Sequence, residues 1–90
     1  MNALDEFVSQ LECNRRGQGC VAVSVCSAHP MVLRAAFRSA LRHDTFALID
    51  STSNQVDQYG GYTGMKPADF AALVGKIAAE ECFPTERVLL

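Results

Sequence analysis

Two short stretches of this 90-residue chain are dense in hydroxyl, amide and ionisable side chains, the types that hold a polar or phosphorylated metabolite. The first is Cys26-Ser27-Ala28-His29-Pro30, and the second is Asp50-Ser-Thr-Ser-Asn-Gln55. Each follows an apolar run typical of a buried strand, and parallel α/β folds bind ligands at the carboxyl ends of their strands. We therefore expect a shared binding rim, whose candidate residues are Ser27, His29, Asp50, Ser53, Asn54 and Gln55.

Two features of this rim leave alternatives open. Asp50 is the best candidate for a functional carboxylate, but a strand-end carboxylate also commonly accepts N–H bonds from the next loop. Cys26 and His29 have a Cys-x-x-His spacing, which fits half a metal site or a thiolate activated by a helix start. Because only two ligands are within reach, we favour a half-buried thiol and a histidine that caps the helix, with no metal on this chain.

The polar loop 51–66 is long for so small a chain, and long loops are often functional. Its glycines, Gly60, Gly61 and Gly64, could present backbone N–H groups to a phosphate. Their spacing matches neither common nucleotide-binding fingerprint. We therefore expect them to supply tight turns.

The elements that must position these residues follow from apolar periodicity. A first helix, capped by Asn2 and ended by Gly17 and Gly19, has the stripe Leu4, Phe7, Val8 and Leu11. Later helices open at Pro30 and Pro67, and their predicted inner faces are Leu33, Ala36, Phe37, Ala40 and Leu41, and Phe70, Leu73, Val74 and Ile77. Strands are expected at Cys20–Val25, Phe46–Ile49 and Arg87–Leu90.

Helices that alternate with buried strands predict an α/β fold with a parallel sheet containing Val21, Leu48 and Leu89. A three-stranded sheet would leave apolar edges, so we expect residues 1–90 to be a single segment of a larger α/β domain. The row Arg34, Arg38 and Arg42 is expected on a solvated helix face, with an acidic partner surface as the alternative.

The composition excludes some classes of protein. Lys and Arg number 8 against 10 Asp and Glu, which argues against a nucleic-acid module. No apolar run is long enough to span a bilayer, and the first residues lack the basic start of a secretory signal. A cytoplasmic protein is therefore expected, and its four cysteines are expected to be free thiols.

The two polar stretches, read with the loop Thr52-Ser-Asn-Gln-Val-Asp-Gln-Tyr-Gly-Gly-Tyr-Thr-Gly-Met65 and with Pro67-Ala-Asp-Phe70, resemble one family closely. It is the non-catalytic subunit of class II D-tagatose-1,6-bisphosphate aldolase, some members of which carry a tagatose-6-phosphate kinase label. The resemblance covers essentially all of the chain after Gly19. Lys66 departs from it, because a threonine is expected there to complete a capping box with Asp69.

The resemblance implies a (β/α)8 (TIM) barrel, of which this chain would supply a helix and the first three strands. It implies an accessory role: stabilising a separate zinc-dependent aldolase subunit in galactitol and N-acetylgalactosamine catabolism, without catalysing the cleavage. The barrel mouth would still bind a sugar phosphate, and this chain would carry neither metal nor cofactor. By itself the chain is expected to oligomerise, aggregate or need the missing strands.

Two other functions remain open. The protein could act directly on a phosphorylated sugar through Asp50, Asn54, Gln55 and His29, as the kinase label suggests, although no kinase-like phosphate loop is present. Alternatively, the chain could be a stand-alone interaction fragment with no chemistry, which would then fold as a cooperative monomer.

Overall fold

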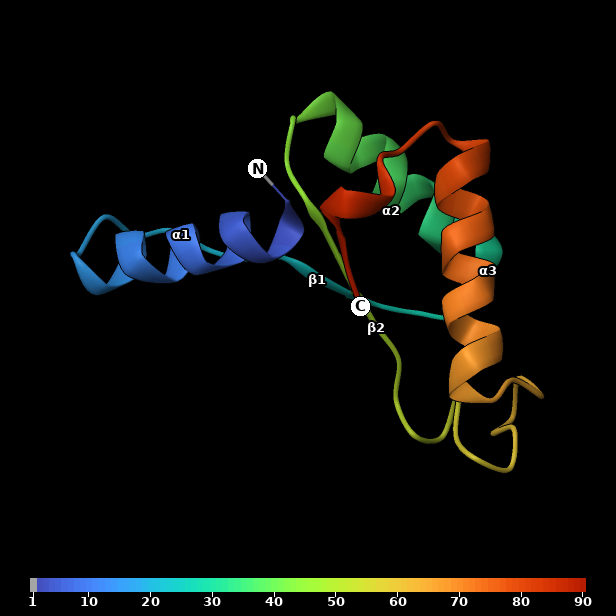
Figure 1. Cartoon of the computed structure of the whole chain (residues 1–90). Coiled ribbons are helices and arrows are strands. Elements are labelled where there is room, and N and C mark those ends of the chain that lie inside the picture. Colours follow the sequence, from blue (N-terminus) through green and yellow to red (C-terminus); the bar gives the residue numbers. More distant parts are fainter. Residues whose placement is uncertain (1) are drawn as a thin grey trace.

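The computed structural model describes residues 2–90, in which helices and strands alternate (Figure 1). The elements are α1 (Ala3–Arg15), β1 (Ser24–Cys26), α2 (Pro30–Arg42), β2 (Ala47–Asp50), α3 (Pro67–Glu80), the 3-10 helix η1 (Thr85–Arg87) and β3 (Val88–Leu89). The strands form one parallel sheet in the order β1-β2-β3. The predicted α/β alternation and parallel pairing are therefore confirmed.

The register of the sheet decides which side chains share a face. Ser24 pairs with Leu48, Cys26 pairs with Asp50, and Leu48 pairs with Leu89. Since side chains alternate along a strand, these five residues lie on one face. The opposite face, which includes the fully buried Ile49, packs against α2 and α3 in one hydrophobic core.

The core is built mainly by the two helices whose periodicity predicted it. Its members are Leu33, Phe37 and Ala40 of α2, Phe70, Val74, Ile77 and Ala78 of α3, Ala47 and Ile49 of β2, and Ala28, Val56 and Phe83. Ala36 and Leu73 are half-buried against it, as expected for helix flanks. Leu41 is an exception, because 44% of it remains exposed at the end of α2.

The starts of α2 and α3 follow from their sequences. Pro30 and Pro67 occupy first-turn positions, where the missing N–H costs nothing. The Asp69 carboxylate accepts the Lys66 N–H at 2.9 Å, so half of the capping box that was expected to be lost is retained. The reciprocal bond, from the Asp69 N–H to the side chain of residue 66, is absent because a lysine ammonium has no lone pair to accept it.

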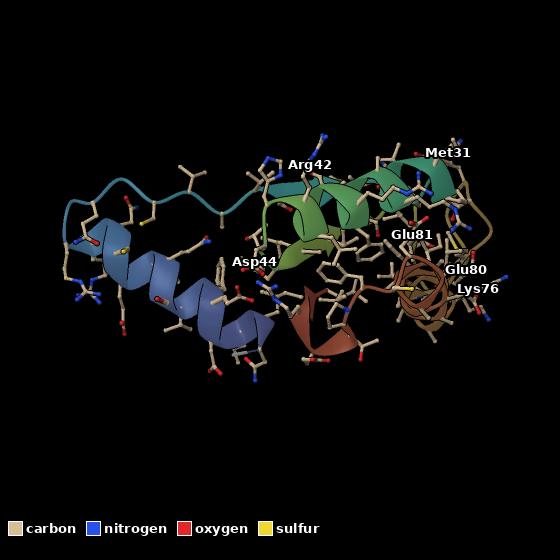
Figure 2. All side chains as sticks on the ribbon, turned by 90° about the horizontal axis from the view of Figure 1, so that it is seen from above. Met31, Arg42, Asp44, Lys76, Glu80 and Glu81 are labelled. Atoms are coloured by element: carbon tan, nitrogen blue, oxygen red, sulfur yellow. The ribbon has the colours of Figure 1, made fainter. Side chains whose placement is uncertain are left out.

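Two members of the arginine row of α2 form ion pairs across the helix interface. The expected solvated face holds for Arg38, whose side chain is 70% exposed, and is wrong for Arg34, which is half-buried. Arg34 lies 2.6 Å from Glu80 and 3.4 Å from Glu81, and Arg38 lies 2.8 Å from Glu81. Figure 2 shows both glutamates at the side of α2, where α3 ends. Only Arg42 stays exposed and outside this network of the described residues.

The pairing makes Glu81 a pH-sensitive contributor to stability. The hydrogen bond from Arg38 lowers the pKa of the Glu81 carboxyl below its ordinary value. A depressed carboxyl pKa stabilises the fold above the unfolded-state pKa, and this stabilisation disappears as the pH falls through the folded-state pKa. We expect Glu81→Gln to lower the urea midpoint at neutral pH, and the difference from the wild type to shrink as the pH falls below about 4.3, the ordinary pKa of a glutamate.

The control for this prediction is Glu86→Gln, since Glu86 is exposed beyond the α2–α3 interface. Its urea midpoint should track the wild type at every pH. A Glu81→Gln difference that persists unchanged at low pH would contradict an electrostatic origin.

Helix α1 does not bury the apolar stripe that predicted it. Leu4, Val8 and Leu11 are 58%, 43% and 47% exposed, and only Ala3 of this helix is buried. The predicted cap is correct, because the Asn2 side chain accepts the Asp5 N–H at 2.9 Å. The periodicity therefore located the helix, but its apolar face lacks cover among residues 2–90.

Helix α1 attaches to the strand starts through one ring contact and one arginine. The rings of Phe7 and Phe46 meet edge to face with centroids 6.2 Å apart. Arg87, just before β3, lies 2.6 Å from Glu6 and 2.8 Å from Asp44, and these hydrogen bonds raise the pKa of its guanidinium. Figure 2 shows Asp44 at this junction, with α1 extending away from it.

The first strand is shorter than Cys20–Val25, and Val21 lies outside the sheet. Pairing with β2 covers only Ser24 to Cys26, while Val21 and Val23 are 76% and 74% exposed. Continuing the register places Val21 opposite Thr45, before β2 begins at Ala47. The third strand is likewise limited to Val88–Leu89, because η1 takes up the residues before it.

Candidate functional site

On the sheet face opposite α2 and α3, residues of β1 and the end of β2 bring a carboxylate, a hydroxyl and a thiol together. The Ser24 Oγ–H donates to Asp50 Oδ1 at 2.9 Å, and Cys26 is the register partner of Asp50. The Cys26 thiol in turn lies 3.8 Å from Gln55 Oε1. These four side chains form a continuous polar rim, which we call the strand-end cluster.

Gln55 is oriented by the start of the loop. The side-chain Oε1 of Gln55 accepts hydrogen bonds from the Thr52 N–H at 2.8 Å and the Thr52 hydroxyl at 3.3 Å. The backbone N–H of Gln55 donates to Thr52 Oγ1 at 3.2 Å. Because the amide oxygen is committed to these bonds, the two N–H donors of the side chain are left outside them. The strand-end cluster therefore offers both an acceptor, Asp50, and a fixed donor, Gln55.

A hollow of about 390 Å³ opens beside Asp50. Its other walls are mostly apolar and come from β2, the loop, the start of α3 and the last residue: Ile49, Ser51, Val56, Pro67, Phe70 and Leu90. An apolar pocket with a few polar groups at its edge is the usual form of a small-molecule site.

The structure places Ser27 and His29 at the start of α2. His29 Nδ1 accepts the Met31 N–H at 3.1 Å, so its neutral ring carries its proton on Nε2. Ser27 Oγ accepts the His29 N–H at 3.1 Å, and the Ser27 N–H donates to the Asp50 carbonyl at 3.1 Å. The favoured role of His29 as a helix cap is confirmed.

Metal-ligating side chains do not gather in the described part of the chain, since no three of His, Cys, Asp and Glu meet in residues 2–90. The four cysteines are free thiols, and a hydrogen bond with Cys13 raises the pKa of the Cys20 thiol. Within the same residues, no helix has the length and apolar character needed to cross a membrane.

The loop 51–66 is closed by its own hydrogen bonds. Asp57 Oδ1 accepts the N–H groups of Tyr59 at 2.7 Å and Gly61 at 3.0 Å. The Tyr62 N–H donates to the Asn54 carbonyl at 2.9 Å. The expected tight turns are therefore present, and the loop is ordered by specific contacts.

Of the predicted site residues, Asp50 and Gln55 lie in the strand-end cluster, and Ser27 is joined to it through the backbone. Ser53 and Asn54 are exposed in the loop, and Asn54 contributes its carbonyl to loop closure. The prediction missed Ser24, which holds the Asp50 carboxylate. Its signal was present, because a polar residue two positions before Cys26 must share its strand face.

Comparison with known proteins places this chain in one family. The model of the "D-tagatose-1,6-bisphosphate aldolase subunit GatZ/KbaZ-like" family matches residues 7–90. A D-tagatose-1,6-bisphosphate aldolase subunit GatZ from Salmonella newport is 52% identical over 87 residues, which are 97% of this chain and 20% of that protein. A D-tagatose 6-phosphate 4-epimerase from Agrobacterium fabrum is 55% identical over 75 residues, or 83% of this chain and 18% of that protein.

A similar fold is found in a solved structure. It is the crystal structure of "a probable tagatose 6 phosphate kinase" from Sinorhizobium meliloti 1021, which is 54% identical with a TM-score of 0.71. The match covers 74% of this chain and 17% of that one. The chain spans about a fifth of the length of the curated relatives it matches. Because the family model covers nearly every residue, this chain belongs to the GatZ/KbaZ-like family of D-tagatose-1,6-bisphosphate aldolase subunits.

Proposed function

We propose that this chain is part of an accessory subunit of class II D-tagatose-1,6-bisphosphate aldolase, which stabilises a separate catalytic subunit. The observation that carries the proposal is the family match over residues 7–90, supported by the GatZ relative at 52% identity. In the assembly, the zinc-dependent partner would cleave the bisphosphate to glycerone phosphate and glyceraldehyde 3-phosphate.

The three parallel strands supply the first part of a (β/α)8 barrel in this proposal. Both α2 and α3 pack on the face that includes Ile49, as the outer helices of a barrel do. The face with Ser24, Cys26 and Asp50 would line the barrel interior, and the strand-end cluster would open at its mouth. That is where barrels of this class bind their ligands, so the cluster would contact a D-tagatose phosphate.

A second candidate function is direct action on D-tagatose 6-phosphate. The observation that favours it is the Agrobacterium fabrum relative, which is named as a 4-epimerase of this sugar phosphate and is 55% identical. In that case Asp50 would stand close to the reacting sugar. A kinase activity has less support, since no phosphate-binding fingerprint occurs in the sequence.

Co-purification tests the accessory role. The intact protein that contains this segment is expressed with the catalytic aldolase subunit, and a tag on one is used to recover the other. We expect stoichiometric recovery that survives washing in moderate salt. The catalytic subunit passing through unbound, while the tagged protein is folded, would reject the accessory role and leave the second candidate.

A further inference from the structure

The strand-end cluster carries a negative charge, which is the opposite of the charge that binds a phosphate group. We infer that this part of the rim recognises the hydroxyl groups of the sugar, and that the phosphate is held elsewhere. The inference rests on the proposed function, because it assigns a role to each end of the D-tagatose phosphate. It is carried by three independent features of the described residues.

The first feature is the sign of the charge. Asp50 is the charged group of the strand-end cluster, and a carboxylate repels a phosphate but accepts hydrogen bonds from sugar hydroxyls. The guanidinium of Arg34, one turn into α2, forms ion pairs with Glu80 and Glu81. Arg87 is committed to Glu6 and Asp44 at the opposite, amino-terminal end of the strands.

The second feature is the state of the two helix starts that follow β1 and β2. Free N–H groups at a helix start attract phosphate, but here Pro30 and Pro67 remove one donor each. The Met31 N–H is taken by His29, and the Lys66 N–H is taken by Asp69. Each of these helix starts therefore presents fewer free backbone N–H groups to a phosphate than a start without the proline and the cap bond.

The third feature is the pairing of one acceptor with one donor. Ser24 fixes one oxygen of Asp50, and Thr52 binds the amide oxygen of Gln55, so the side-chain N–H groups of Gln55 take no part in these bonds. Neighbouring hydroxyls of a sugar both donate and accept, so they complement such a pair. Of this pair, Asp50 also lines the hollow of about 390 Å³, which offers space for the carbon chain.

The test measures two ligands against the intact protein by titration calorimetry: D-tagatose 6-phosphate and inorganic phosphate. For Asp50→Asn, we expect the affinity for the sugar phosphate to fall about tenfold or more, and that for inorganic phosphate to change less than about twofold. Asparagine keeps an acceptor for Ser24, so the fold should be retained. A phosphate seated at this rim would predict the reverse, because loss of the like charge would tighten binding of both ligands.

Gln55→Glu provides a second variant in case Asp50→Asn is poorly folded. It keeps the oxygen that binds Thr52, removes the N–H donors and adds a second carboxylate to the cluster. It should therefore also weaken the sugar phosphate about tenfold, while sparing an inorganic phosphate that binds elsewhere. The control is Lys66→Met, which removes the cation at the start of α3 and should leave both affinities within about twofold.

The outcomes separate this inference from the proposed function. If the wild type binds D-tagatose 6-phosphate but Asp50→Asn tightens both ligands, or Lys66→Met abolishes phosphate binding, the inference alone is overturned. If the wild type binds no D-tagatose 6-phosphate, the assignment of a D-tagatose phosphate to this rim fails, and the inference fails with it.

Discussion

Replacement of Phe37 by alanine is expected to lower the free energy of unfolding by about 3–5 kcal/mol. Phe37 of α2 is fully buried. The centroid of its ring lies 5.1 Å from that of Phe83, in the segment after α3. Removing the ring leaves a cavity that α2, α3 and β2 all border, and packed interiors refill such spaces only in part. Urea unfolding of the intact protein measures the loss.

Met31→Ala is the matched control, because Met31 lies in the same helix but is 69% exposed. Its free energy of unfolding should stay within about 0.5 kcal/mol of the wild type. Equal losses in the two variants would show that α2 does not pack as described.

The substitution Gly61→Ala is expected to cost about 2–4 kcal/mol and to displace the loop that orients Gln55. Gly61 has φ +59°, and a methyl group on it would lie 2.6 Å from the Gln55 carbonyl carbon. The two halves of the loop cannot separate without loss, since the Thr63 hydroxyl donates to the Gln55 carbonyl at 2.6 Å. The urea midpoint and the affinity for D-tagatose 6-phosphate should therefore fall together.

Gly64→Ala isolates the steric part of this effect. Gly64 also has a positive φ, +79°, but a methyl group there would meet nothing within 4 Å. Only the backbone preference then remains, which is about 1–2 kcal/mol. Were Gly64→Ala as costly as Gly61→Ala, the close approach of Gly61 to Gln55 would not be the cause.

The parts of the fold that the sequence predicted well are those fixed by local patterns. Pro30 and Pro67 marked the starts of α2 and α3, and the apolar periodicity after each proline identified most of the residues that pack in the core. Burial of a helix stripe requires only that some apolar partner is present, so the identity of the partner did not matter.

The parts that it predicted poorly depend on distant partners. Val21 and Val23 are apolar enough for a strand, but β2 supplies pairing only from Ser24 onward. The partners of Arg34 and Arg38 lie more than 40 residues away, in Glu80 and Glu81, and no local pattern identifies them. Arginines that are exposed to solvent and arginines that form ion pairs with another helix have the same spacing in the sequence, so the spacing does not distinguish them.

The candidate site shows the same division. The position of Asp50 at a strand end was readable, because the carboxyl ends of parallel strands share one edge. The contact of Ser24 with Asp50 depends on the register of β1 against β2, which pairs Ser24 with Leu48. The role of His29 as a helix cap could be predicted from the proline that follows it.

A product-resolved assay tests the central claim, that this protein supports an aldolase and does not itself transform the sugar. D-tagatose 6-phosphate and D-tagatose 1,6-bisphosphate are each incubated with the intact protein, with the catalytic subunit, and with both, and products are followed by phosphorus NMR. We predict that the intact protein alone leaves both sugars unchanged, and that adding it prolongs glycerone phosphate formation by the catalytic subunit. Conversion of D-tagatose 6-phosphate to its C4 epimer by the intact protein alone, with no gain in aldolase lifetime, would contradict the account.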